Sequence, residues 1–236
     1  MEVKFLGNWS SHIKAGVKNT SILIDGKTVA DFGPHTLESM LEKNIDPSSV
    51  DLVLITHLHL DHYLGLIEFL WYRGSRKLKN AVTVMGPPGI RETTESMLKL
   101  VNTPENGGYE LNVEYVESGK HDFVSTFKGN HTIPDNVYRL DFRDSSVVYT
   151  GDTAYTENVV KAAEDADLLI HEMTYSDRNA ERAAYWKHST CSSTIRVFEE
   201  SKAKRLAPTH LTDESLEFLQ AQARDGIILP FGDIVL

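Results

Sequence analysis

The chain contains the stretch Leu54-Ile55-Thr56-His57-Leu58-His59-Leu60-Asp61-His62. The apolar run at 50–55, interrupted only by Asp51, predicts a short buried strand that ends at Thr56. Four side chains that bind metals follow within six residues: His57, His59, Asp61 and His62. Imidazole suits zinc and iron, and a carboxylate neutralises part of the charge of the cation. So dense a cluster at a strand end predicts a metal site.

The order of these side chains indicates how they could bind more than one metal. Side chains alternate between the two faces of an extended segment, so His57 and His59 point to the same side. In an extended chain Asp61 would lie on the same face as His57 and His59, whereas His62 would lie on the opposite face. A turn after His59 would let Asp61 and His62 approach from another side. The segment could then supply ligands to two adjacent metals.

Length and composition predict one soluble domain with an acidic surface. The 236 residues suffice for a single domain, 1–236, with a substantial core. The hydrophobic share of 41% and the charged share of 25% are ordinary for a soluble globular protein. The formal net charge of −10 does not attract polyanions, so any nucleic acid would have to bind at a local patch.

Cysteine usage and the lack of long apolar runs suggest a compartment. Cys191 is the single cysteine, which excludes an internal disulfide and a thiolate metal cluster and fits a reducing environment. The apolar run within residues 1–7 is too short for a signal peptide, and no run reaches the roughly 18 apolar residues of a membrane span. We therefore expect a cytoplasmic protein without membrane contact.

Strand and helix patterns are mixed along the chain. We expect strands at residues 3–6, 20–24, 28–32, 50–55, 81–85, 111–116, 123–127, 137–142, 146–150, 167–170 and 205–207, with a hairpin turn at 25–27 and a loop at 106–108. We expect helices at residues 36–44, 63–72, 90–101, 156–165, 190–201 and 213–223. Several neighbouring strands have no helix between them, which argues against a doubly wound sheet. The pattern predicts an α/β (α+β) fold with two sheets packed as a sandwich and helices outside.

Two segments next to the ligand cluster allow alternative interpretations. The predicted helix at 63–72 is apolar on nearly all sides, so it is either buried in its own chain or covered by the partner of a homodimer. The basic run that follows is either a solvated loop or a patch for a polyanion such as RNA. That run consists of Arg73, Arg76, Lys77 and Lys79.

Further ligand-type side chains follow predicted strands in the second half of the chain. His131 follows the strand at 123–127, Asp152 follows the strand at 146–150, and His210 follows the strand at 205–207. Each residue alone has an ordinary explanation, as a loop, turn or helix-start residue. Their shared position after strands makes them candidates to complete a dinuclear site.

This ordered set of ligand-type residues resembles that of the metallo-β-lactamase superfamily. The sequence motifs around these residues resemble those of its ribonuclease Z branch, which includes short phosphodiesterase relatives. The likeness covers nearly the whole chain. It is carried by Phe5-Leu6-Gly7, Asn19-Thr20-Ser21, the run from His57 to Leu66, Gly151-Asp152-Thr153, His171-Glu172-Met173-Thr174 and His188-Ser189-Thr190.

The resemblance implies a four-layer αββα sandwich with two divalent metals at the sheet edges, usually zinc, with manganese and iron as alternatives. One metal would be held by His57, His59 and His131, and the other by Asp61, His62 and His210. Asp152 would bridge the two metals. Residue types and chain order match the family at all seven positions.

The resemblance also implies phosphodiester hydrolysis. Two metals suit in-line displacement at phosphorus, because they lower the pKa of bound water from about 15.7 towards 7 and clamp the oxygens that gain charge. Asp61 would accept a proton from that water, and His188, oriented by Glu172, would protonate the leaving alkoxide. Without the resemblance, Glu172 is a strand-end acid and His188 a residue before a helix. The remaining histidines, which match no ligand of the family, are His12, His35, His121 and His171. We expect all four to be structural or at the surface, with His12 and His35 in loops at the site mouth.

The chain departs from the ribonuclease Z pattern in three places. The long arm that grips transfer RNA in that family lies between the third ligand and the bridging aspartate, and here only 21 positions separate His131 from Asp152. Leu60 replaces the usual glycine. The residues after His210 are 211–214, Leu-Thr-Asp-Glu, without the serine and arginine of the pattern. Arg139 and the basic run at 73–79 are candidates to replace the missing cations.

The sequence therefore predicts a metal-dependent phosphodiesterase acting on small or single-stranded phosphodiesters, with RNA as one candidate substrate. The alternatives are a genuine transfer-RNA 3′-processing endonuclease, a thioester, lactone or β-lactam hydrolase on the same fold, and a metal-binding protein without turnover. Cleavage of precursor transfer RNA at one site would favour the first alternative. The acid–base pair argues against a thioester, lactone or β-lactam hydrolase, because the leaving groups of those substrates need less acid assistance. The complete ligand set argues against a metal-binding protein without turnover.

Overall fold

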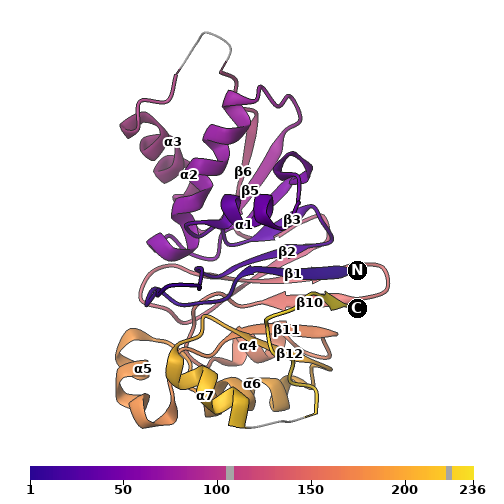
Figure 1. The fold of residues 1–236 in the computed structure, drawn as a ribbon. Helices are drawn as coiled ribbons and strands as arrows, with labels where there is room; N and C mark the ends of the chain where they lie inside the picture. The colour runs from indigo at the N-terminus through magenta and orange to yellow at the C-terminus, as the bar shows by residue number, and fades with distance from the viewer. Residues whose placement is uncertain (105–108, 222–224) are drawn as a thin grey trace.

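Two mixed β-sheets pack face to face in the computed structural model, which describes residues 1–104, 109–221 and 225–236 (Figure 1). In spatial order the first sheet contains β13 (Ile234–Val235), β1 (Glu2–Gly7), β2 (Ser21–Ile24), β3 (Thr28–Ala30), β4 (Leu52–Leu54), β5 (Val82–Gly86) and β6 (Val113–Glu117). The second contains β12 (Leu206–Thr209), β11 (Leu168–Glu172), β10 (Ser146–Tyr149), β9 (Asn136–Asp141), β8 (Val124–Lys128) and β7 (Lys120–His121).

Helices form the two outer layers (Figure 1). The layer on the first sheet contains α1 (Thr36–Glu42), α2 (Leu60–Ser75) and α3 (Ile90–Leu100). The layer on the second contains α4 (Glu157–Ala162), α5 (Ala180–Trp186), α6 (Cys191–Ser201) and α7 (Asp213–Ala221). Two 3₁₀ turns, η1 (Pro47–Ser49) and η2 (Asp177–Asn179), complete the described elements. This arrangement confirms the predicted four-layer sandwich of two sheets with flanking helices.

The strand β2 shows why the layers stay together. Its Ile22 and Ile24 pack in the core between the two sheets, against residues such as Tyr138 and Ile170 of the second sheet. Leu23 points the other way, into the core under the first helical layer. All four residues of β2 are buried, because both faces of the sheet are covered. Burial of each such aliphatic side chain stabilises the fold by about 1.5–3 kcal/mol.

Parallel pairing brings selected strand ends to the same place. In the first sheet β3, β4, β5 and β6 are parallel neighbours. In the second sheet β10, β11 and β12 are parallel neighbours. The carboxyl ends of parallel strands lie at one edge of a sheet, so the residues that follow these strands are gathered there. The remaining strands pair antiparallel, including the hairpin of β9 and β10.

The structure differs from the sequence prediction at the start of α2. This helix begins at Leu60, three residues before the predicted start, so Asp61 and His62 lie in its first turn and not in a turn before it. The apolar periodicity begins only at Tyr63, which hid the true start. A carboxylate in the first turn is stabilised by the positive end of the helix dipole.

One short helix and two short strands were absent from the prediction. Helix α5 has one buried residue, Ala183, so it lacks the apolar stripe by which amphipathic helices are recognised. The strands β7 and β13 have two residues each, too few to show alternation. The predicted loop at 106–108 and the predicted helix end at 222–223 lie outside the described residues.

Packing within the chain accounts for most of the apolar surface of α2. Leu66, Phe69 and Leu70 are buried in the core under the first helical layer. Leu60 and Leu64 remain 63% and 37% exposed. Burial therefore explains the helix without a partner chain. None of the described helices combines the length and apolar character that crossing a membrane requires.

Arg73 does not belong to a surface patch. It is 2% exposed, and its guanidinium donates hydrogen bonds to the backbone oxygens of Val50 and Asn80. This side chain connects the end of α2 to the segments that directly precede β4 and β5. The prediction that Arg73 forms part of an accessible basic run was therefore wrong.

The strand β11 carries a buried histidine that is not among the predicted ligands. His171 is fully buried, with Nδ1 3.3 Å from Thr150 Oγ1 and Nε2 without a hydrogen-bond partner. Burial disfavours the imidazolium and lowers the pKa of His171 to about 4. As the pH falls below 6.5, the unfolded chain takes up this proton before the folded chain does. The contribution of His171 to stability is therefore lost between pH 6.5 and pH 4.

We expect the variant His171→Gln to lose less stability than the wild type between pH 7 and pH 4. The histidine accounts for up to about 3 kcal/mol of the loss, since each pKa unit corresponds to about 1.4 kcal/mol. Urea unfolding of chelator-treated protein at several pH values measures this difference. His121→Gln on β7 is the control and should follow the wild type. Parallel curves for wild type and His171→Gln would contradict the assignment.

Candidate metal centre

Loops from both sheets meet at one edge of the sandwich and gather the ligand-type side chains named from the sequence. His57 and His59 follow β4, His131 follows β8, Asp152 follows β10, Glu172 ends β11 and His210 follows β12. Asp61 and His62 come from the first turn of α2, and His188 precedes α6. The structure brings all nine residues into one cluster of neighbouring groups.

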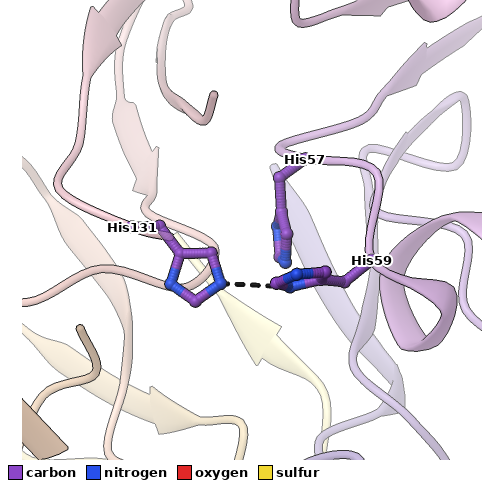
Figure 2. Close-up of side chains that lie close together, drawn as sticks. All are labelled: His57, His59 and His131. Carbon is purple, nitrogen blue, oxygen red and sulfur yellow. Dashed lines mark hydrogen bonds between the residues drawn. The ribbon is translucent and has the colours of Figure 1, made fainter. Parts of the chain in front are cut away.

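His57, His59 and His131 form the first group of three. Their nitrogens lie within 4.8 Å of one another, and Nε2 of His131 is 3.1 Å from Nδ1 of His59. Figure 2 shows the three imidazoles converging, two from the segment after β4 and one from the opposite side of the cluster. The group therefore joins a loop of the first sheet to a loop of the second.

Asp61, His62 and His210 form the second group of three. Their ligand atoms also lie within 4.8 Å of one another, with His210 Nε2 3.3 Å from Asp61 Oδ2. Oδ2 of Asp152 is 3.3 Å from Nε2 of His62 and 3.3 Å from Nε2 of His210. The same oxygen is 3.9 Å from Nε2 of His57. The carboxylate of Asp152 therefore lies between the two groups.

Contacts outside the cluster fix the rings of four histidines. In each ring Nδ1 contacts a partner outside the cluster, so Nε2 is the nitrogen that faces the other ligand atoms. The partners of Nδ1 are Thr56 Oγ1 for His57 at 3.0 Å, Asp31 Oδ2 for His62 at 2.6 Å, the backbone oxygen of Lys187 for His131 at 3.2 Å, and Thr174 Oγ1 for His210 at 2.8 Å. Metal-binding histidines are typically held in this way.

Unpaired buried atoms test whether metal ions fit this cluster. Nε2 of His57, Nε2 of His62 and Oδ1 of Asp152 are buried and have no hydrogen-bond partner. Each unpaired buried polar group costs about 1–3 kcal/mol, so three of them in one cluster call for a ligand. Neutral imidazoles with carboxylates are a donor set for divalent transition metals. The residues fit divalent metal ions.

The charge states follow from burial and neighbouring groups. Burial lowers the pKa of His57 and of His131, which keeps both imidazoles neutral with free lone pairs. Burial alone would raise the pKa of Asp61, but the hydrogen bond from His210 and the charge of His62 lower it to about 2. The charges of His210 and His62 likewise outweigh burial and lower the pKa of Asp152.

A histidine–glutamate pair adjoins the cluster. His188 Nδ1 is 3.1 Å from Oε1 of Glu172, and the His188 ring stacks on that of His210. Burial works against a charge on His188, but the Glu172 carboxylate outweighs it and raises the pKa of His188 to about 9. Glu172 is fully buried and also accepts hydrogen bonds from the backbone N–H groups of Thr153 and Ser189 and from the Thr174 hydroxyl. These donors occupy its oxygens, so Glu172 orients His188.

Asp31 is a site residue that the sequence analysis missed. Its buried carboxylate accepts hydrogen bonds from His62 Nδ1 at 2.6 Å, the backbone N–H of Thr56 at 2.7 Å and the Tyr149 hydroxyl at 2.6 Å. The predicted strand at 28–32 included this residue, whereas β3 ends at Ala30 and Asp31 takes a φ of 53°. The signal available in the sequence was an aspartate between two apolar residues, shortly before Gly33-Pro34.

The cations proposed from the sequence do not reach the cluster. Arg139 donates to Asp141 and to the backbone oxygens of Ala162 and Glu164, so its guanidinium is committed to the end of α4. The exposed part of the basic run, at 76–79, lies beyond the C-terminal end of α2. Fifteen helical residues from Asp61 correspond to about 22 Å. Neither group can contact a phosphate at the metal centre.

Comparison with known proteins places these observations in a family. Residues 20–211 match the family model described as beta-lactamase superfamily domain. Ribonuclease Z of Myxococcus xanthus is 30% identical over 233 residues, which cover 75% of this chain and 76% of that protein. Ribonuclease Z of Methanothermobacter thermautotrophicus is 28% identical and covers 90% of this chain and 87% of its own. The crystal structure of the short form of human tRNase Z superposes with a TM-score of 0.82 at 22% identity, covering 100% and 99% of the two chains, which supports the fold.

We expect Asp31→Asn to weaken metal binding by about 10–100-fold, because loss of an outer partner of a ligating histidine typically has this effect. Competition with a chromophoric chelator measures the affinity. Asp51→Asn, at an exposed aspartate just before β4, is the matched control and should bind metal as the wild type does. Equal metal affinity of Asp31→Asn and wild type would show that His62 does not depend on Asp31.

Proposed function

This chain belongs to the β-lactamase superfamily and, within it, to the ribonuclease Z family of metal-dependent hydrolases, and we propose that it cleaves phosphodiester bonds in short single-stranded RNA with two divalent metal ions. The observation that carries this proposal is the pair of three-ligand groups on either side of Asp152, with His188 beside them in hydrogen-bond contact with Glu172. Two adjacent metals and one acid are what in-line displacement at phosphorus requires.

The ligand assignment follows the two groups. His57, His59 and His131 would hold one metal, and Asp61, His62 and His210 the other, with Asp152 between them. Zinc suits this donor set, and manganese and iron are the alternatives. When bound, the cations would activate a water molecule and neutralise charge that develops on the phosphate.

Side chains of the protein supply the proton transfers. Asp61 is ionised and 13% exposed, so it can accept a hydrogen bond and then a proton from the attacking water. The water oxygen forms a bond to phosphorus while the bond to the leaving oxygen breaks. His188 carries its second proton on Nε2 because Glu172 accepts the hydrogen bond from Nδ1. That proton passes to the leaving oxygen, which would otherwise depart as a poorly stabilised alkoxide.

The length of the segment between the third ligand and Asp152 favours a short substrate. In the described chain, β9 and β10 form a tight hairpin that fills most of the 20 positions between His131 and Asp152, with no inserted arm. The exposed basic residues at 76–79 are far from the centre. We therefore expect the protein to bind its substrate through side chains close to the scissile bond.

Precursor transfer RNA is the second candidate substrate. Relatives that cover most of this chain are named ribonuclease Z, and the chain spans 87% of one of them. Incubation with a precursor transfer RNA distinguishes the two candidates. Cleavage at one site after the acceptor stem would favour the endonuclease, whereas shortening of unstructured RNA alone would favour the short substrate.

A homodimer through α2 is a separate proposal. Leu60 and Leu64 are its exposed apolar side chains, and both lie next to the ligand segment. Sedimentation of the wild type and of Leu64→Glu measures it. A monomeric wild type would rule this interface out.

We expect His59→Ala to lose bound metal and His188→Ala to retain it. General acid catalysis is typically worth about 10²–10⁴-fold, so His188→Ala should lose a rate factor of this size on an RNA dinucleotide. The loss should be smaller on bis-p-nitrophenyl phosphate, since nitrophenolate leaves without a proton. Metal content and kcat with both substrates are measured, and His35→Ala, at an exposed histidine beside Glu38, is the control. Full dinucleotide turnover by metal-loaded His188→Ala would exclude the proton-donor role.

A further inference from the structure

A cavity of about 250 Å³ lies beside the proposed metal centre and has no role in the mechanism so far. It opens between α5, the start of α7 and the loop after β1, and Figure 1 shows α5 and α7 next to each other. Its lining includes the side chains of Trp9, His12, Tyr175, Arg182 and Glu214. The cavity therefore combines three aromatic rings with one cation and two carboxylates, because Asp213 lines it as well as Glu214.

Tyr175 connects this cavity to the catalytic pair. Its ring lines the cavity and lies 5.8 Å from the ring of His188, centroid to centroid. Thr212, another lining residue, follows His210 by two positions and donates a hydrogen bond to the backbone oxygen of Thr174. A group bound in the cavity would therefore lie beside the side chain that protonates the leaving oxygen.

Arg182 is the cation that this cavity presents. Its guanidinium lies over the Tyr175 ring, 5.6 Å from the ring centroid, and its side chain is exposed. Among the described residues no carboxylate lies within 4 Å of the guanidinium, so its charge is not neutralised by an ion pair. Of the two acidic lining residues, Asp213 pairs with Lys14. Glu214 accepts hydrogen bonds from Ser176 and Asn179, and the charge of Arg182 also helps to lower its pKa. Arg182 is available to bind an anion.

We propose that this cavity binds the nucleoside next to the scissile phosphodiester and that Arg182 binds the phosphate of that nucleotide. The inference rests on the proposed function, because it names the part of the substrate that lies beside His188. It also identifies a cation close to the centre in a chain that lacks the arginine its family pattern leads one to expect after His210.

The chemistry of the walls supports a nucleoside. Aromatic rings and the plane of an arginine are the surfaces on which unpaired bases stack in RNA-binding proteins. The Glu214 carboxylate can accept a hydrogen bond from a ribose hydroxyl or an exocyclic amine. Pockets for drug-sized ligands have volumes of about 300–1,000 Å³. A cavity of about 250 Å³ therefore suits one nucleoside and not a longer segment of RNA. Arginine donates two parallel hydrogen bonds to a phosphate.

Binding of adenosine 5′-monophosphate to the metal-loaded protein tests the proposal by calorimetry, with no turnover required. We expect the wild type to bind this nucleotide more tightly than ribose 5-phosphate, and Arg182→Ala to bind it about tenfold more weakly or worse. Arg182→Lys should recover part of the affinity, since lysine keeps the charge but not the paired donors. With an RNA dinucleotide, Arg182→Ala should raise KM more than it lowers kcat.

Arg178→Ala is the matched control. Arg178 is an exposed arginine on the neighbouring turn η2, and it lines a different cavity with Ser176, Asp177 and Glu217. This variant should bind and turn over substrate as the wild type does. An equal loss in Arg178→Ala, an unchanged affinity in Arg182→Ala, or equal binding of ribose 5-phosphate and the nucleotide would each overturn the proposal.

The outcomes separate this proposal from the proposed function. Nucleotide binding that depends on Arg182, together with no hydrolysis of any phosphodiester, would refute the function and support the nucleoside cavity. Hydrolysis of RNA without measurable nucleotide binding at millimolar concentration would support the function and refute the cavity. Metal content and the thermal midpoint of each variant confirm that the protein is intact.

Discussion

The buried carboxylate of Asp31 is the interaction on which the geometry of the site depends. It joins the first sheet to the second through the Tyr149 hydroxyl, and it holds the start of α2 through His62. It also fixes the segment after β4 through Thr56. A buried carboxylate is stable only when its oxygens are fully hydrogen-bonded, so these partners have little freedom to move. The two halves of the ligand set are thereby held in one arrangement.

The site separates its ionisable groups by environment. Deep burial keeps the histidines of the first group neutral, and neighbouring cationic groups keep Asp61 and Asp152 ionised. A few ångströms away, a carboxylate with no exposed surface keeps His188 protonated. The histidines of the first group and His188 therefore differ in charge at the same pH although they belong to one cluster. Local structure sets this difference, because imidazoles in water titrate close together, near pH 6.5.

The sequence located the residues of the candidate site better than their surroundings. The candidate ligands could be found because they follow apolar strands and belong to a small set of residue types, and local patterns reveal both features. Asp31 was missed because an aspartate beside a strand looks the same whether it caps a turn or joins two sheets. The role of Arg73 could not be predicted, since it depends on backbone oxygens of residues 50 and 80 that only the fold brings near. The segment that supplies Arg182 was not recognised as a helix, because a helix with one buried residue shows no periodic pattern.

The placement of the ligands on both sheets has a consequence for the chain as a polymer. His57 and His210 are 153 positions apart, and two cations, one held by each group beside Asp152, would link them as a cross-link does. With a single cysteine the chain has no covalent means of doing so. Closing a long loop costs only slightly more entropy than closing a short one, whereas the link removes many conformations from the unfolded chain. Uptake of the cations would then add a cross-link to the packing between the two sheets, and their release would remove that cross-link.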